Sequence, residues 1–183
     1  MKFNLKNAFF SLLALIAIPL TLAIFIDKDY NVENEILIQQ PKTLVFEYVK
    51  SLRNQDKFSK WANIDPNIIK TYSGTDKTVG FVAAWQSDHP EVGNGEQEII
   101  KITEGERIDF EFRFFEPYSG TFSGYMITEA ISENQTKVRW GFDGRMDYPL
   151  NLILLTSSLQ NTMKKDFGIG LQNLKKLLEN SEE

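Results

Sequence analysis

The last segment of the chain carries one long apolar stripe. Between residues 159 and 179, apolar side chains recur at steps of three and four residues, which is the spacing of one face of a helix. Lysine, glutamine and glutamate side chains occupy the opposite face. The pattern predicts a long amphipathic C-terminal helix whose apolar face needs a partner. The residues of the stripe are Met163, Phe167, Leu171, Leu174 and Leu178.

Upstream of this helix, apolar and polar residues alternate in short runs that are separated by turn residues. In residues 108–114 every second side chain is apolar and those between are charged, which is the pattern of a strand with one buried face. The joints between the runs are short and rich in turn-forming residues, which favours hairpins and therefore antiparallel pairing. The predicted strands are 32–38, 68–73, 79–86, 96–103, 107–115, 120–132 and 136–143.

Two short helices are expected between the first strand and the second. Pro41 and Thr43 are typical of a helix start, and the apolar residues after them give this helix a buried face. A second short helix is expected over residues 54–61, and Asp65 and Pro66 end it. The elements together predict an α+β fold, in which a curved antiparallel sheet of about seven strands wraps around the long C-terminal helix.

A run of nineteen uncharged residues, 8–26, precedes the first strand. A helix rises about 1.5 Å per residue, so this run nearly spans a membrane hydrocarbon core of about 30 Å. The apolar region of a signal peptide is usually shorter, and Thr21 and Ala23 are followed by further apolar residues instead of a polar exit. An uncleaved membrane anchor is therefore favoured over a cleaved signal peptide or a buried helix of a soluble protein.

The chain is thus expected to have two parts, a membrane anchor in residues 1–30 and a folded domain in residues 31–183. Lys2 and Lys6 precede the apolar run, whereas only Lys28 follows it closely. Because positive charge beside a span favours the cytoplasmic side, the sequence predicts a single-pass membrane protein whose folded domain lies outside the cytoplasm.

Charge and composition exclude several kinds of site. Only Lys2 and Lys6 precede residue 27, so the rest of the chain holds 18 Lys and Arg residues against 25 Asp and Glu residues, a net charge of −7. A nucleic-acid partner is not expected, since phosphate binding needs a basic face. The chain has no cysteine, which excludes disulfides, thiolate metal sites and thiol nucleophiles. Its fourteen phenylalanines indicate that bulky rings fill or line something larger than an ordinary core.

Several short motifs follow one another in order along residues 31–179. They are Pro41 with Val45-Phe46, Trp61 to Pro66, Gly93-x-Gly95, Phe115-x-Pro117, Thr136-Lys137-Val138-x-Trp140 with Gly144, and Asp166-Phe167-x-x-Gly170-Leu171-x-x-Leu174-Lys175. With the order of the elements, they resemble the START-like (SRPBCC) superfamily, specifically its polyketide cyclase/dehydrase and lipid transport branch. The resemblance implies a helix-grip fold with a deep apolar pocket between sheet and long helix, which accommodates lipids, polyketides or other hydrophobic small molecules. It leaves the chemistry open, because members include enzymes, carriers and ligand-sensing modules.

The alternation indicates which rings would face such a pocket. Three strands present rows of apolar residues that meet the stripe of the C-terminal helix if they lie on the concave side of the sheet. A plain aromatic core without a ligand is the alternative interpretation of the same residues. The candidate ligand-binding residues are Trp61, Phe81, Trp85, Phe110, Phe112, Trp140, Phe142, Met163, Phe167 and Leu171.

No catalytic constellation is visible beside these rings. His89 is the single histidine, and its place in a predicted hairpin loop indicates an exposed residue. The segment Gly93-Asn94-Gly95 is interpreted as a hairpin turn, because the helix and lysine of a phosphate loop do not follow it. Arg113 and Arg139 alternate away from the rings, and we expect them to pair with carboxylates such as those of Glu111 or Asp109. No catalytic residue, metal ion or cofactor is expected.

The sequence therefore predicts binding or transfer of a hydrophobic small molecule, lipid-like or polyketide-like, in an apolar cavity at a membrane. A cyclase- or dehydratase-type enzyme that uses the same pocket is the alternative, with a pocket acid or tyrosine as proton donor. A third interpretation is a structural partner in a membrane complex that uses its surface instead of a cavity. Binding is favoured because three rows of rings face the helical stripe and no catalytic constellation accompanies them.

Overall fold

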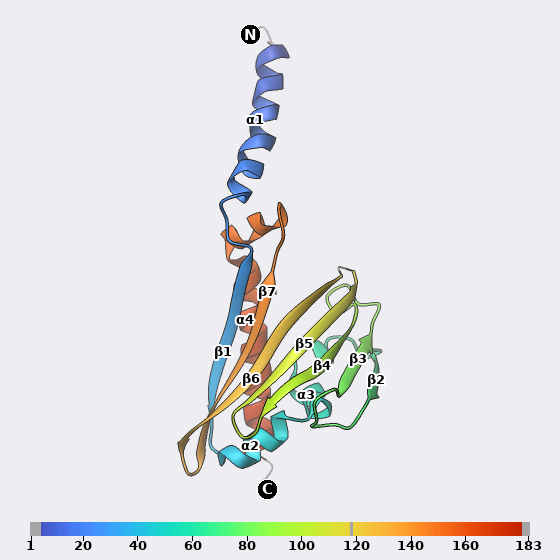
Figure 1. The fold of residues 1–183 in the computed structure, drawn as a ribbon, viewed down its shortest axis with the longest axis vertical. Helices are drawn as coiled ribbons and strands as arrows, with labels where there is room; N and C mark the ends of the chain where they lie inside the picture. The colour runs from blue at the N-terminus through green and yellow to red at the C-terminus, as the bar shows by residue number, and fades with distance from the viewer. Residues whose placement is uncertain (1–4, 118, 181–183) are drawn as a thin grey trace.

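Seven strands form one antiparallel sheet in the computed structural model, which describes residues 5–117 and 119–180 of the 183-residue chain. The strand order is β1-β7-β6-β5-β4-β3-β2, so β2 to β7 are a meander and β1 returns to pair with β7. The sheet curves around α4 (Figure 1). The strands are β1 (Asp29–Ile38), β2 (Ile69–Ser73), β3 (Val82–Gln86), β4 (Asn94–Thr103), β5 (Arg107–Glu116), β6 (Gly120–Ser132) and β7 (Gln135–Arg145).

The predicted C-terminal helix is α4 (Ser158–Glu179), and its apolar stripe faces the inside of the sheet. Phe167, Leu171, Leu174 and Leu178 are at most 4% exposed, and Met163 is half-buried. The α+β architecture predicted from the two periodicities is therefore confirmed. A sheet with one apolar face and a helix with one apolar stripe bury those faces against each other.

A glycine lets α4 lie close to the sheet and to the neighbouring helix. A Cβ atom on Gly170 would lie 2.7 Å from Cζ3 of Trp140 and 3.4 Å from the carbonyl oxygen of Phe58. The ring of Trp140 fills the space that a side chain at this position would need. Close packing therefore offsets the loss of about 1 kcal/mol that glycine brings to a helix interior.

Three short helical segments join β1 to β2. They are α2 (Lys42–Val49), α3 (Leu52–Phe58) and the 3-10 turn η1 (Trp61–Asn63). The helix predicted over residues 54–61 begins earlier, because the Ser51 side chain accepts a hydrogen bond of 3.3 Å from the backbone N–H of Asn54 and caps α3. It also ends earlier, at Phe58, because Ser59 has an extended backbone. Trp61 belongs to the separate turn.

Two strands begin three residues away from their predicted starts. The strand expected over residues 79–86 begins only at Val82, because Lys77 and Gly80 have positive φ and turn the chain. Val79, expected in the inward row, is 57% exposed. The first strand begins at Asp29 instead of residue 32, since its pairing with β7 continues to Arg145.

Helix α1 (Leu5–Ala23) extends away from the body (Figure 1). Among the described helices, α1 alone is long and apolar enough to cross a membrane. The C-terminal end of α1 contacts the 3-10 segment η2 (Leu150–Thr156), which was not predicted from the sequence. Asn151 Nδ2 donates hydrogen bonds to the carbonyl oxygens of Ala23, at 2.7 Å, and Ile26, at 3.0 Å, and so satisfies backbone groups at the helix terminus.

Candidate functional site

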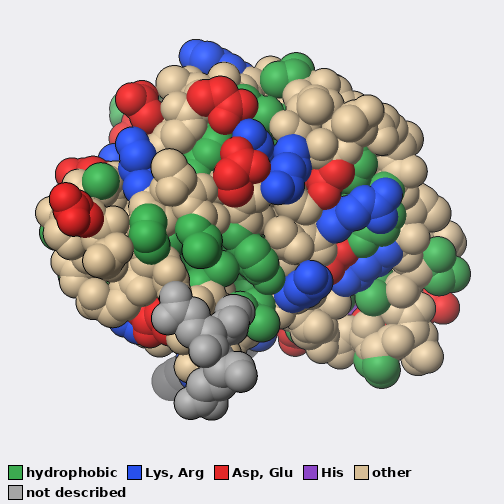
Figure 2. Space-filling model, turned by 90° about the horizontal axis from the view of Figure 1, so that it is seen from below, with side chains coloured by type: hydrophobic (Ala, Val, Ile, Leu, Met, Phe, Trp, Pro, Cys, Tyr) green, Lys and Arg blue, Asp and Glu red, His purple; other side chains and the backbone are tan. Residues whose placement is uncertain are grey.

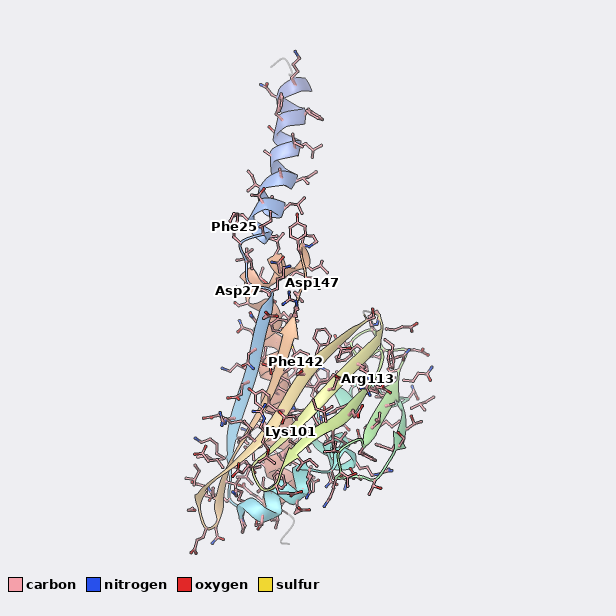
Figure 3. All side chains as sticks on the ribbon, viewed as in Figure 1. Phe25, Asp27, Lys101, Arg113, Phe142 and Asp147 are labelled. Carbon is pink, nitrogen blue, oxygen red and sulfur yellow. The ribbon has the colours of Figure 1, made fainter. Side chains whose placement is uncertain are left out.

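A cavity of about 260 Å³ lies between the concave face of the sheet, the segment α3–η1 and the first half of α4. Phe142 on β7 lines the cavity, whereas Arg113 on β5, two strands away in the sheet, is not among the lining residues (Figure 3). Seven of the ten candidate ligand-binding residues line the cavity. They are Trp61, Trp85, Phe112, Trp140, Phe142, Met163 and Phe167.

The other three candidates, Phe81, Phe110 and Leu171, are fully buried in the core and are not among the lining residues. Phe110 lies on β5 and Leu171 on α4, whereas Phe81 immediately precedes β3. Along β5, Phe110 is 0% exposed, whereas Phe112, two residues further, reaches the cavity. The cavity therefore occupies only one end of the space between sheet and helix.

Two separate groups of aromatic contacts form the cavity wall. Phe167 lies 4.9 Å from Trp140 and 5.3 Å from Trp61, measured between ring centroids, so α4, η1 and β7 meet at this point. On the other side, the rings of Phe112 and Phe142 are 5.8 Å apart. Such edge-on and tilted contacts hold large rings in defined positions. The wall is therefore set by packing from several elements at once.

One part of the wall is polar and internally neutralised. Lys70 Nζ lies 3.1 Å from Asp56 Oδ1, and the hydroxyl of Tyr72 donates a hydrogen bond to Asp56 Oδ2. Burial, and secondarily the hydrogen bond to Asp56, raise the pKa of Tyr72 to about 12. Tyr72 is therefore a neutral phenol at ordinary pH, and its proton is already committed to Asp56.

Two glutamines complete the polar part of the wall. Gln97 Nε2 donates a hydrogen bond of 3.1 Å to Gln55 Oε1, and both residues are less than a tenth exposed. Neither residue was predicted from the sequence to belong to the site. The signal was present for Gln97, because it alternates with Ile99 on the inward face of β4 while Glu96 and Glu98 face outward.

The comparisons with known proteins concern the fold. No family model and no curated protein matches the chain. TTHA0849 from Thermus thermophilus is similar with a TM-score of 0.60 at 17% identity, over 83% of this chain and 99% of that one. Ara h 8.0201 has a TM-score of 0.58 at 15% identity, over 84% and 99% of the two chains. The Aha1 protein from Colwellia psychrerythraea has a TM-score of 0.57 at 16% identity, over 82% of this chain and 96% of that one.

The fold is a helix-grip fold, and these solved structures are similar to it over almost their whole length. At these identities the likeness concerns architecture alone, and the chemistry of the cavity has to come from its own residues. The similar structures are covered almost completely, and the helix-grip domain of this chain therefore has their full set of elements.

His89 lies in the loop before β4 and is not among the residues that line the helix-grip cavity. Its Nδ1 atom accepts a hydrogen bond of 3.2 Å from the backbone N–H of Glu91, which gives it a local role in the loop. Among the described residues, no group of three or more His, Cys, Asp or Glu side chains could hold a metal ion.

The interpretation of Gly93-Asn94-Gly95 as a hairpin turn was wrong in part. Asn94 and Gly95 already belong to β4. A Cβ atom on Gly95 would lie 2.6 Å from Trp85 Cζ2, so this glycine makes room for a ring of the cavity wall. The turn itself lies earlier, in the residues between Gln86 and Gly93.

The two arginines face away from the cavity as predicted. Arg113 makes ion pairs with Glu96 and Glu111, each at 2.5 Å, and with Glu98 at 2.7 Å, and these hydrogen bonds raise its pKa. Arg139 approaches Glu33 at 3.8 Å. The partners lie mostly on neighbouring strands, where side chains of the same sheet face are close enough to pair.

Proposed function

We propose that this helix-grip domain binds a hydrophobic small molecule, lipid-like or polyketide-like, in its cavity at a membrane. The observation that carries the proposal is the cavity, which leaves about 260 Å³ between rings in a domain whose core is otherwise packed. Protein interiors leave few voids larger than a water molecule, and concave sites with mostly apolar walls and a few polar groups are typical of small-molecule binding.

Binding is better supported than catalysis. The enzyme alternative needs a tyrosine or acid of the cavity that can donate a proton to a ligand. Among the described residues of the cavity wall, Tyr72 is the tyrosine, and Asp56 and Glu91 are the acids. The hydroxyl of Tyr72 already donates to Asp56, which also pairs with Lys70. The three groups satisfy one another, which supports a structural and solvating role.

Membrane attachment through residues 8–26 is the second part of the proposal. The apolar side chains of α1 are exposed, and the exposed apolar surface continues onto the body, where Phe25 is 81% exposed and Leu150 and Leu155 are each 64% exposed. Phe25, Asp27 and Asp147 lie at the end of the body from which α1 departs (Figure 3). At the opposite end, basic, acidic and hydrophobic side chains are interspersed over the surface (Figure 2). The exposed apolar surface that continues from α1 onto the body supports a body that stands with its α1 end toward the lipid.

The three tryptophans provide the test of ligand uptake, because Trp61, Trp85 and Trp140 all line the cavity. Naphthalene bound beside these rings should quench the tryptophan fluorescence of the full-length protein in a saturable way, once the signal is corrected for absorption and emission by naphthalene itself. Ala83→Phe adds a phenyl ring inside the cavity and should abolish this quenching. Thr71→Phe adds the same ring on the exposed face of β2 and serves as the control.

Equal quenching of wild type and Ala83→Phe would place naphthalene outside the cavity. The structural-partner interpretation would then replace ligand binding. Saturable quenching in wild type and Thr71→Phe, with melting temperatures that match, supports the proposal.

Membrane attachment is tested by alkaline extraction of membranes from cells that make the full-length protein. The wild type should stay in the pellet, and Leu15→Arg should shift protein to the supernatant, because a charge at the centre of a span costs about 2.5 to 3.5 kcal/mol. Glu133→Cys places a single thiol on the exposed β6–β7 hairpin of a chain without cysteine. Labelling of this thiol in intact cells by an impermeant maleimide supports an extracytoplasmic domain, and labelling only after lysis contradicts it.

A further inference from the structure

The amide pair of Gln55 and Gln97 joins two elements that are far apart in sequence. Gln55 lies on α3 and Gln97 on β4, and both line the cavity. They are 8% and 6% exposed. Two primary amides at this depth are unusual beside an aromatic wall, because a buried polar group costs free energy unless it is hydrogen-bonded.

The pair leaves one –NH₂ group and one carbonyl group without a hydrogen bond. A single hydrogen bond, 3.1 Å long, joins the two amides, and neither makes another side-chain hydrogen bond within the described part of the chain. Each amide has one carbonyl and one –NH₂ group, so the bond uses the –NH₂ of one and the carbonyl of the other. Whichever way the two amide planes are turned, one –NH₂ group and one carbonyl oxygen remain.

These two groups are not sealed inside the protein. Neither belongs to the fully buried polar atoms without a partner, which in the described residues are Arg139 Nε and Asn151 Oδ1. Gln55 and Gln97 therefore keep access to the space that they line. Ser59, one turn after Gln55 on the same wall, adds a hydroxyl that can donate or accept.

We propose that the Gln55–Gln97 pair binds the hydroxyl group of an otherwise apolar ligand, an alcohol or a phenol. A hydroxyl can accept from the free –NH₂ group and donate to the free carbonyl at the same time. An ether or ketone can only accept, and it leaves the carbonyl unpaired. The inference rests on the proposed ligand-binding function and names the class of ligand.

The charges of the cavity disfavour a carboxylate ligand. Among the described lining residues, Asp56 and Glu91 are acidic and Lys70 is basic, and Lys70 is already paired with Asp56. A carboxylate would accept from the –NH₂ group only and would meet a net negative lining. A neutral hydroxyl satisfies both amides without bringing a charge out of water.

The experiment compares naphthol, its methyl ether and naphthoic acid as quenchers of tryptophan fluorescence in the full-length protein. The three probes share one ring system and differ only in the head group. Naphthol should bind wild type roughly threefold to tenfold more tightly than the methyl ether, which corresponds to about one neutral hydrogen bond. Naphthoate should bind more weakly than naphthol.

The variants Gln97→Leu and Gln55→Leu should each remove the preference for naphthol over the ether while the ether still binds. Gln86→Leu, at an exposed position of β3, should leave the preference unchanged. If the amide pair were purely structural, either variant would instead lower the melting temperature and leave the ratio of the naphthol and ether affinities as in wild type.

If either variant fails to fold, the ratio of naphthol to methyl ether affinity in the wild type decides by itself whether the hydroxyl assignment holds. Equal binding of naphthol and ether, or tighter binding of naphthoate, overturns the hydroxyl assignment and leaves the cavity proposal standing. No saturable binding of any probe overturns the cavity proposal itself, and the hydroxyl assignment with it.

Discussion

Replacing Phe167 with alanine tests whether α4 closes both the core and the cavity. The side chain is 3% exposed and touches the rings of Trp61 and Trp140, with centroid distances of 5.3 and 4.9 Å. Truncation of a buried phenylalanine typically costs about 3 to 5 kcal/mol, and ring contacts of about 0.5 to 1.5 kcal/mol each form part of that cost. Phe167→Ala should therefore lower the melting temperature by roughly 6 to 20 °C.

The assay is thermal unfolding of the full-length protein followed by tryptophan fluorescence, which reports directly on the two rings that Phe167 contacts. Ile169→Ala is the matched control, because Ile169 is an apolar residue of the same helix that is 37% exposed. Its effect should stay within about 1 kcal/mol. Equal shifts for the two variants would refute the packing of this stripe against the sheet.

Three further predictions concern charges and a proton. Lys60 Nζ lies 2.7 Å from the buried carboxylate of Asp166, so Lys60→Met should destabilise the domain by leaving that carboxylate without its partner. The double variant Lys60→Met, Asp166→Leu should recover stability, and urea unfolding measures both effects. Because the pKa of Tyr72 is raised to about 12 in the folded protein, the stability that this group contributes is fully present below pH about 10 and is lost as pH rises through about 12. Tyr72→Phe should therefore lose less stability than wild type across this pH range. Arg113→Met leaves three glutamates facing one another, and its lower melting temperature should recover partly as salt is added.

Periodicity identified the faces of the elements but not the level of the cavity. Phe110 and Phe112 are equivalent in the alternation of β5, yet the first is sealed in the core and the second borders the cavity. On α4, Leu171 and Phe167 show the same contrast. The position of the cavity along the sheet depends on where α2, α3 and α4 lie across it, and the pattern of a single strand does not contain that information.

The polar features of the cavity were missed for a related reason. Gln55 in a short helix and Lys70 in a short strand look like ordinary surface residues when each segment is considered alone. Their role depends on partners from other elements, such as Gln97 for Gln55 and Asp56 for Lys70. Tyr72 likewise has a raised pKa because tertiary contacts bury it beside Asp56.

The sequence by itself determined the features that repeat along the chain. The stripe of α4 repeats with the turn of a helix, the strands repeat with a period of two, and the uncharged run 8–26 has the length of a span. Tertiary structure decided the rest, which is the position of the cavity, the Gln55–Gln97 pair and the hydrogen bond from Asn151 to the end of α1. Free volume is what remains after every element has packed, and a hydrogen bond between distant residues has no period, so neither appears in the sequence before the chain is folded.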